Sequence, residues 1–175
     1  IEGLVSDMIL APSGQPRNHD ILGAGDLIGF EFLGKNSTDL SISLCRALTR
    51  VNLLFIEKHQ FASALDDHPV LLRSLLQYAI SRSAQTRKNP RQQAPVEAQL
   101  CLLLLALKEA GRLPIDAGRV LLPSEISQRT LGDLLCMSTR QFRQARQALQ
   151  QLEIDEMGIT FNDDEVHQII ESAFV

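Results

Sequence analysis

Apolar and polar positions follow a helical period near the end of the chain, between residues 127 and 152. One apolar row has spacings of three, four and three residues, which places its members on one side of a helix. This row consists of Phe142, Ala145, Leu149 and Leu152. The opposite side carries Arg140, Arg143, Gln144 and Gln147. A shorter apolar row, Leu131, Leu134 and Leu135, comes before it. The pattern predicts two short helices joined by a tight turn.

The start of the second helix is encoded locally. Ser138 and Gln141 form the S-x-x-Q pattern of a capping box, and Met137 with Phe142 can form the accompanying hydrophobic staple. Such a cap contributes about 1 kcal/mol and fixes which side chains the first turn presents. In the first helix Ser127 is the corresponding cap. Gly132 provides the small residue expected where two such helices cross.

The polar side of the second helix has the chemistry of a DNA-reading surface. Arginine and glutamine make bidentate contacts to guanine and adenine edges, whereas hydroxyl and backbone N–H groups suit phosphate oxygens. We therefore predict a helix-turn-helix. The residues expected to contact bases are Arg140, Arg143 and Gln144. Those expected to contact phosphates are Ser127, Gln128, Thr139 and Gln141, and Ser138 belongs to the same DNA-binding surface. The alternative is an ordinary helical hairpin with a solvated arginine face.

Residues 1 to 56 have strand chemistry. Short β-rich runs alternate with turns that contain glycine, proline and asparagine. The predicted strands are 4–10, 20–22, 27–33, 40–44 and 51–56. Short strands separated by glycine turns predict a small barrel or roll.

After Ile56 the period becomes helical. A short helix is predicted at 58–65, and Asp66-Asp67-His68-Pro69 marks a helix start with an acidic cap. From Val70 to Lys88 two neighbouring rows are apolar, which is more than packing on one roll requires. Part of this helix is therefore expected to pair with a second copy. A helix buried within its own subunit is the alternative. The prolines of 89–95 end the helix and mark a hinge.

Three further elements complete the chain. Val96 to Ala110 is predicted as a helix that ends at Gly111. Residues 154–161 are expected to form a hairpin that turns near Gly158, like the wing of a winged helix. Asp163 or Asp164 is expected to cap a last helix. The chain thus divides into a roll at 1–66, a dimerisation helix and hinge at 67–92 and a DNA-binding domain at 93–175, an α+β architecture.

Composition is typical of a globular protein, with 45% hydrophobic and 22% charged residues and a formal net charge of −4. Residues 127–151, in contrast, hold four arginines and one aspartate. A basic patch on an acidic body suits a site-selective DNA binder.

The apolar run 100–107 is too short to cross a bilayer. The cysteines at 45, 101 and 136 have neither metal-ligand nor disulfide spacing. We therefore expect a cytoplasmic protein without membrane contact and without a cofactor or metal in this stretch.

The order of these parts resembles the catabolite activator, or Crp/Fnr, family of bacterial transcription regulators. The likeness covers nearly the whole chain: residues 1–5 (IEGLV) are similar to a family strand, 25–29 (GDLIG) match its G-D-x-I-G, and 47–49 (ALT) precede its last roll strand. Phe61, Pro69 and the long helix fit its dimerisation segment. The resemblance implies a cyclic-nucleotide-binding-like jelly roll, a winged helix-turn-helix, and a homodimer on near-palindromic double-stranded DNA. It also implies RNA polymerase and a small-molecule effector as partners, and a start within the roll, consistent with Ile1 in place of methionine.

The effector region departs from the family pattern. Cyclic-nucleotide-binding members place a glutamate directly after G-D-x-I-G and an arginine at the next strand, which hold the cyclic phosphate. Here Phe30 follows Gly29, Glu31 is shifted by one, and 39–43 contain no arginine. Losing that charge-assisted pair costs about 1.5 to 3 kcal/mol, so we predict no response to cAMP. Gly29, Glu31 and Ser41 are the candidate effector-binding residues. Cys136 takes a turn position where the family frequently has glycine.

Other classes of function have weaker support. A small-ligand or gas-sensing module whose helix-turn-helix mainly mediates protein interaction is the alternative. The four histidines, at 19, 59, 68 and 167, share no ligand spacing, and His68 is better explained as a helix-start residue. An enzyme is not expected, because the sequence has no nucleophile–base pairing, no phosphate-binding glycine loop and no paired carboxylates in a plausible cleft.

Overall fold

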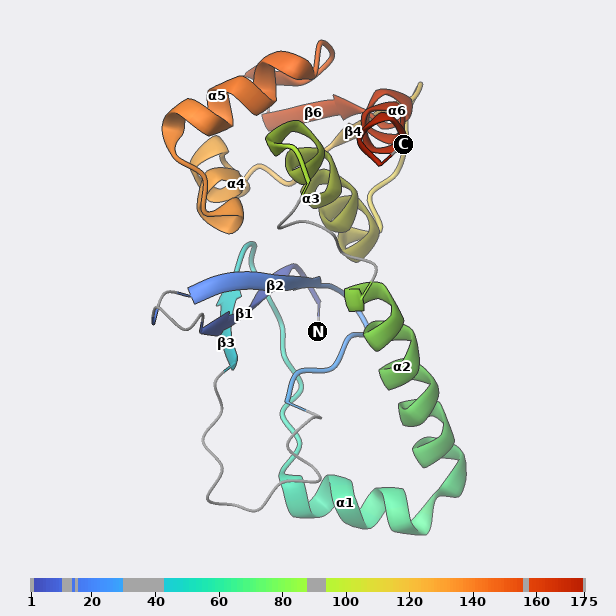
Figure 1. The fold of residues 1–175 in the computed structure, drawn as a ribbon. Coiled ribbons are helices and arrows are strands. Elements are labelled where there is room, and N and C mark those ends of the chain that lie inside the picture. Colours follow the sequence, from blue (N-terminus) through green and yellow to red (C-terminus); the bar gives the residue numbers. More distant parts are fainter. Residues whose placement is uncertain are drawn as a thin grey trace.

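The computed structural model describes residues 2–10, 14, 16–29, 43–87, 94–155 and 158–174 (Figure 1). In these residues the chain forms two three-stranded antiparallel sheets and six helices, which is an α+β architecture. The first sheet and helices α1 and α2 come from the first half of the chain, and the other elements come from the second half. Within the same residues no helix combines the length and apolar character that a membrane crossing requires.

The first sheet has the strand order β2-β1-β3, with β1 at Val5–Leu10, β2 at Pro16–Leu22 and β3 at Ser43–Ala47. Val5 pairs with Leu22 on one side and with Ala47 on the other. The strand predicted at 4–10 is confirmed. β2 begins earlier than predicted. β3 includes 43 and 44 of the strand predicted at 40–44 and continues to Ala47, while 40–42 lie outside the described residues. Residues 27–29 form no strand, and the rest of the strand predicted at 27–33 lies outside the described residues.

The strand predicted at 51–56 is wrong. In this segment Asn52 makes an isolated bridge to Glu2, while 53–57 have no strand pairing. The side chains of Leu54 and Phe55 are 84% and 85% exposed. The segment has strand chemistry, but a strand needs a neighbour for its backbone N–H and C=O groups. No neighbouring strand pairs with it in the described part of the chain.

Two helices follow, α1 at Lys58–Asp67 and α2 at Pro69–Arg87. Both confirm the predicted helices, and Pro69 occupies the first position of α2. Asp66 and Asp67 do not cap α2, because they form the last turn of α1. His68 stands between the helices: its N–H donates to the carbonyl of Ala64, and its own carbonyl accepts from the N–H groups that begin α2.

One side of α2 contacts residues 20–27, at the end of β2 and just after it, through polar side chains. The Tyr78 hydroxyl donates to Oδ1 of Asp26 at 3.2 Å and accepts from the N–H of Leu27 at 3.1 Å. Arg82 forms an ion pair with Asp20. Burial raises the pKa of the Tyr78 hydroxyl, which therefore stays protonated and keeps its proton to donate.

A second side of α2 is apolar and faces solvent. Its residues are spaced by four and are 43%, 54% and 68% exposed. They are Leu72, Leu76 and Ile80. We call this set the outer row of α2.

Helix α3, at Val96–Gly111, packs against α5 and α6 and also contacts β2 of the first sheet (Figure 1). Its buried leucines join one apolar cluster with residues of the sheet. The first sheet contributes Ile21 of β2, together with Leu4 just before β1 and Leu48 just after β3, and α3 contributes Leu100, Leu103, Leu104 and Leu107. A methyl group on Gly23 would come within 1.8 Å of the Ala110 carbonyl oxygen, so only glycine fits this approach.

The end of α3 differs in detail from the prediction. The helix ends at Gly111, but the left-handed residue is Arg112, with φ 48°. The Arg112 guanidinium donates to the carbonyl oxygen of Ala24 at 3.2 Å, and this contact holds the residue in place.

The second half also contains β4 (Arg119–Leu121), α4 (Gln128–Leu135), α5 (Thr139–Ala148), β5 (Glu153–Asp155), β6 (Gly158–Asn162) and α6 (Asp163–Ala173). The second sheet has the order β4-β6-β5. The predicted hairpin is confirmed, since β5 and β6 are antiparallel and Asp155 pairs with Gly158. β4 is a third strand that we did not predict.

The cap of α6 is Asn162 rather than Asp163 or Asp164. Oδ1 of Asn162 accepts from the N–H of Glu165 at 2.8 Å. Asp163 is the first helical residue, and its carboxylate lies 2.7 Å from Nζ of Lys108, with both side chains largely buried. This ion pair joins residues 55 positions apart, and it explains why Asp163 points into the protein instead of capping the helix.

Candidate nucleic-acid interface

Helices α4 and α5 form the predicted helical pair, at the upper left of Figure 1. Oγ of Ser138 accepts from the N–H of Gln141 at 3.3 Å, and Oε1 of Gln141 accepts from the N–H of Ser138 at 3.0 Å. The capping box is therefore confirmed. Oγ of Ser127 likewise accepts from the N–H of Thr130 at 3.2 Å and caps α4. Both helices begin where their caps predict.

The four residues of the predicted apolar row, Phe142, Ala145, Leu149 and Leu152, are all buried in the apolar cluster. Only Phe142 and Ala145 lie on α5, however, because the helix ends at Ala148, before Leu149 and Leu152. The turn before α5 contains Cys136 in a left-handed conformation, with φ 53°, which explains why glycine suits this position. The crossing of the helices is looser than expected. A methyl group on Gly132 would lie 3.9 Å from Cδ2 of Phe142, which is ordinary van der Waals contact.

The outward side of α5 is exposed to solvent. This holds for all the residues predicted to contact DNA, including the two at the start of α4. They are Ser127, Gln128, Ser138, Thr139, Arg140, Gln141, Arg143 and Gln144. The phosphate contact predicted for Gln141 can involve only part of its side chain. Its amide oxygen is engaged in the cap, so only its amide N–H groups are available to a phosphate.

The arginines of this surface take part in no ion pair among the described residues. They are Arg129, Arg140, Arg143 and Arg146. Asp133 lies 3.8 Å from the guanidinium of Arg46 on β3, so the one acidic residue of 127–151 already has a partner. The charges of Arg129, Arg140 and Arg143, whose residues are exposed, therefore remain available to an anionic ligand, while Arg146 is only partly exposed.

Gln144 has a neighbour that sequence reasoning missed. Its Nε2 lies 3.4 Å from Oε1 of Glu97, in the first turn of α3. A carboxylate accepts hydrogen bonds but cannot donate them, so the amide nitrogen of Gln144 faces Glu97 and the amide oxygen faces away. The residues are 47 positions apart, and no local pattern could have revealed the contact.

The capping box gives a direct test of how α5 is positioned. In Ser138→Ala the N–H of Gln141 loses its acceptor, and we expect the free energy of unfolding to fall by about 1 kcal/mol. Chemical denaturation measures this loss. Ser172→Ala on α6 is the matched control, because Ser172 donates to a carbonyl within its helix and caps nothing. Equal losses in the two variants would contradict a capping role for Ser138.

The effector candidates lie only partly within the described residues. Gly29 has φ 83°, while Glu31 and Ser41 lie outside. In the part of the chain that the structure describes, no group of three or more His, Cys, Asp or Glu residues could hold a metal ion. Burial raises the pKa of the Cys101 thiol to about 12, so this cysteine is a neutral core residue.

No protein-family model and no curated protein matches the sequence. Solved structures do match. A CRP/FNR-family transcriptional regulator from Thermus thermophilus superposes with a TM-score of 0.73 at 19% identity, over 98% of this chain and 86% of that protein. The chain has the CRP/FNR fold.

Two further structures extend this finding. The c-di-GMP-responsive global regulator CLP of Xanthomonas campestris has a TM-score of 0.71 at 17% identity, over 93% of this chain and 82% of that protein. FixK2 of Bradyrhizobium japonicum has a TM-score of 0.67 at 17% identity, over 97% of this chain and 84% of that protein. The CRP/FNR fold thus covers both halves of the chain, as the order of the predicted elements implied. At this identity the roles of individual residues must come from the geometry of this chain.

Proposed function

We propose that this protein is a sequence-specific DNA-binding transcription regulator that acts as a homodimer. In this proposal α5 is the recognition helix and enters the major groove of duplex DNA. Arg140, Arg143 and Gln144 contact base edges. Ser127, Gln128 and Thr139, with the amide N–H groups of Gln141, contact phosphates and set the register.

The observation that carries the proposal is the outward side of α5. Its guanidinium and amide groups are exposed, and its arginines have no acidic partner among the described residues. The same helix has a fixed start and a buried inner side, so it presents these groups from a rigid support. Exposed arginines without an ion-pair partner, held on a rigid support, are what recognition of base edges and phosphates requires.

The outer row of α2 supports the homodimer. Leu72, Leu76 and Ile80 leave an apolar stripe in solvent along a helix whose other side already contacts its own chain. Two such stripes bury each other when two copies of α2 pair side by side, as in a two-stranded coiled coil. The dimer then presents two recognition helices about 34 Å apart to successive major grooves of a near-palindromic site.

The β5–β6 hairpin takes the place of a wing beside the helical pair. It follows α5 directly and is tied to β4 by three residue pairs, beginning with Arg119 and Asn162. A hairpin held in this way can contact the phosphate backbone beside the groove that α5 enters.

Salt dependence of DNA affinity tests the proposal simply. Each phosphate contact releases counterions and contributes a slope of about −0.9 to the plot of log K against log salt concentration. We expect a steep slope for the wild-type chain and a slope shallower by about one in Arg129→Ala, if Arg129 contacts one phosphate. Affinity for duplex DNA that does not change with salt would contradict DNA binding through this surface.

Arg140→Ala is expected to relax sequence preference at one base position of the site. A bidentate arginine–guanine contact contributes about 1 to 3 kcal/mol of discrimination against the wrong base. Titration of duplexes that differ at single positions measures this loss. Arg50→Ala, which removes an exposed arginine from the first half of the chain, is the control and should leave discrimination unchanged. Equal weakening of Arg140→Ala on all duplexes would mean that Arg140 contacts only phosphate.

A further inference from the structure

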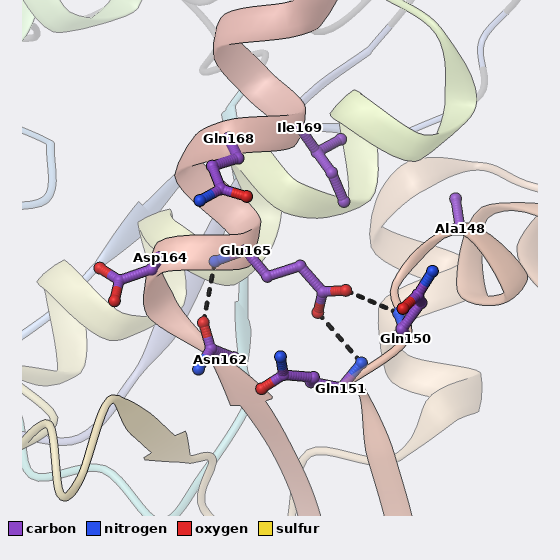
Figure 2. A pocket seen from close by; sticks show the side chains of 8 residues that line it. All are labelled: Ala148, Gln150, Gln151, Asn162, Asp164, Glu165, Gln168 and Ile169. Carbon is purple, nitrogen blue, oxygen red and sulfur yellow. Dashed lines mark hydrogen bonds between the residues drawn. The ribbon is translucent and has the colours of Figure 1, made fainter.

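The end of α5 is held by a carboxylate from another helix. Oε1 of Glu165, in the first turn of α6, accepts from the N–H of Gln150 at 2.7 Å. Its Oε2 accepts from the N–H of Gln151 at 3.1 Å. Figure 2 shows the Glu165 side chain reaching from α6 to the main chain of these two residues, beside an open hollow of about 490 Å³. Both oxygens of one carboxylate thus hold two consecutive backbone N–H groups.

These two residues form the turn by which the chain leaves α5. The helix ends at Ala148, Leu149 is extended, and β5 begins at Glu153. The position of this turn sets both the direction of the last turn of α5 and the start of the hairpin. Charge-assisted hydrogen bonds to backbone N–H groups are the stronger class of protein hydrogen bonds, so the carboxylate restrains this turn firmly.

The carboxylate itself stands on a fixed support. Asp163, two residues earlier, forms the buried ion pair with Lys108 of α3, and its N–H donates to the carbonyl of Gly118 at 2.9 Å. The N–H of Glu165 is held by Asn162. α6 is therefore fastened to α3, and Glu165 extends that support to the far end of α5. The near end of α5 is fixed separately by Ser138.

We infer that Glu165 is a positioning residue for DNA recognition: it sets the tilt of α5 and so aligns Arg140, Arg143 and Gln144 with base edges. The inference rests on the proposed function and adds a residue that contacts no DNA. Base contacts need accurate alignment, whereas non-specific attraction to phosphate needs only the charges. Loss of Glu165 therefore weakens specific binding and spares non-specific binding.

If only the charge of Glu165 mattered, replacing it would raise the affinity for DNA instead of lowering it. Glu165 is negative, and removing a negative charge from a DNA-binding domain raises its affinity for phosphate. A decrease in specific affinity therefore separates the positioning role from the charge of the residue.

The experiment compares Glu165→Gln and Glu165→Ala with the wild-type full chain. Fluorescence anisotropy measures binding to two duplexes of about 30 base pairs, long enough for two half-sites. One carries the sequence that the wild type enriches from random DNA, and the other is unrelated. Glu171→Gln, on the exposed side of the same helix, makes the same charge change and is the matched control.

We expect the ratio of specific to non-specific affinity to fall about tenfold in Glu165→Ala, which loses both acceptors, and about threefold in Glu165→Gln, which keeps one. Glu171→Gln should keep the wild-type ratio. A folding defect would lower both affinities in proportion to the folded fraction, which thermal unfolding measures, and would leave the ratio unchanged. If Glu165→Ala does not fold, Glu165→Gln decides alone.

An unchanged ratio in the folded Glu165 variants would overturn the inference while leaving the proposed function intact. A wild-type chain that enriches no sequence from random DNA would overturn the proposed function, and the inference with it. The two failures are therefore distinguishable.

Discussion

The substitution Leu76→Glu is expected to separate the two subunits of the proposed dimer and to raise its dissociation constant by at least about a hundredfold. Leu76 is the middle member of the outer row of α2, and its side chain is 54% exposed in the single chain. Burying one leucine side chain contributes about 1.5 to 3 kcal/mol, and two-fold symmetry makes the loss occur twice. The substitution also places two like charges opposite each other.

Analytical ultracentrifugation over a range of protein concentrations measures this dissociation constant. DNA binding should report the same change, because a monomer contacts one half-site. The affinity for a complete near-palindrome should fall far more than the affinity for an isolated half-site.

Ser74→Glu is the matched control for Leu76→Glu. Ser74 is exposed on α2 but lies about 160° around the helix from Leu76, by the turn angle of an α-helix. The Ser74→Glu substitution should therefore leave the dimer intact. A dimer that survives Leu76→Glu, or one that Ser74→Glu disrupts equally, would contradict pairing through the outer row.

Lys108→Met is expected to lower the free energy of unfolding by about 3 kcal/mol. The substitution removes the ammonium group that lies 2.7 Å from the Asp163 carboxylate, whose side chain is only 12% exposed, and leaves the more distant His167, at 3.9 Å, as its one basic neighbour among the described residues. A buried charge that has lost its partner keeps its desolvation cost and gains nothing in return. Urea denaturation of the full chain measures the loss, and Lys108→Met/Asp163→Asn should recover part of it.

The control for this prediction is an exposed ion pair in the same half of the chain. Arg119 on β4 pairs with Glu153 on β5, and their side chains are 42% and 60% exposed. Arg119→Met should therefore cost at most about 1 kcal/mol. If Lys108→Met cost no more than Arg119→Met, the ion pair would not be what fastens α6 to α3.

Features that depend on neighbouring residues were predictable from the sequence. The capping box of α5 joins Ser138 to Gln141, three positions apart, and both partners belong to one local pattern. The burial of Phe142 and Ala145 on α5 follows from helical periodicity. For the same reason the predicted outward residues are all exposed. Leu149 and Leu152 are buried too, but beyond the end of the helix, so the pattern predicted their burial and not their conformation. The recognition surface was accessible to sequence reasoning because it is built on one short helix.

Features that depend on distant partners were not predictable in this way. The residues at 51–56 have the composition of a strand, but strand formation depends on a neighbour that no local pattern supplies. Asn162 and Asp163 are both good helix caps, and Lys108, far earlier in the chain, decides between them. Glu97 and Glu165 reach the α5 region only through the packing of α3 and α6.

Selection of duplex DNA from a random pool by the full chain tests the central claim most directly, namely that the outward side of α5 reads a DNA groove in duplicate. We expect enrichment of two similar half-sites in inverted orientation, with centres about 10 base pairs apart, and a changed preference at one position of each half-site in Arg140→Ala. A pool without any enriched sequence, or enriched sequences that substitutions at 140, 143 and 144 leave unchanged, would contradict it.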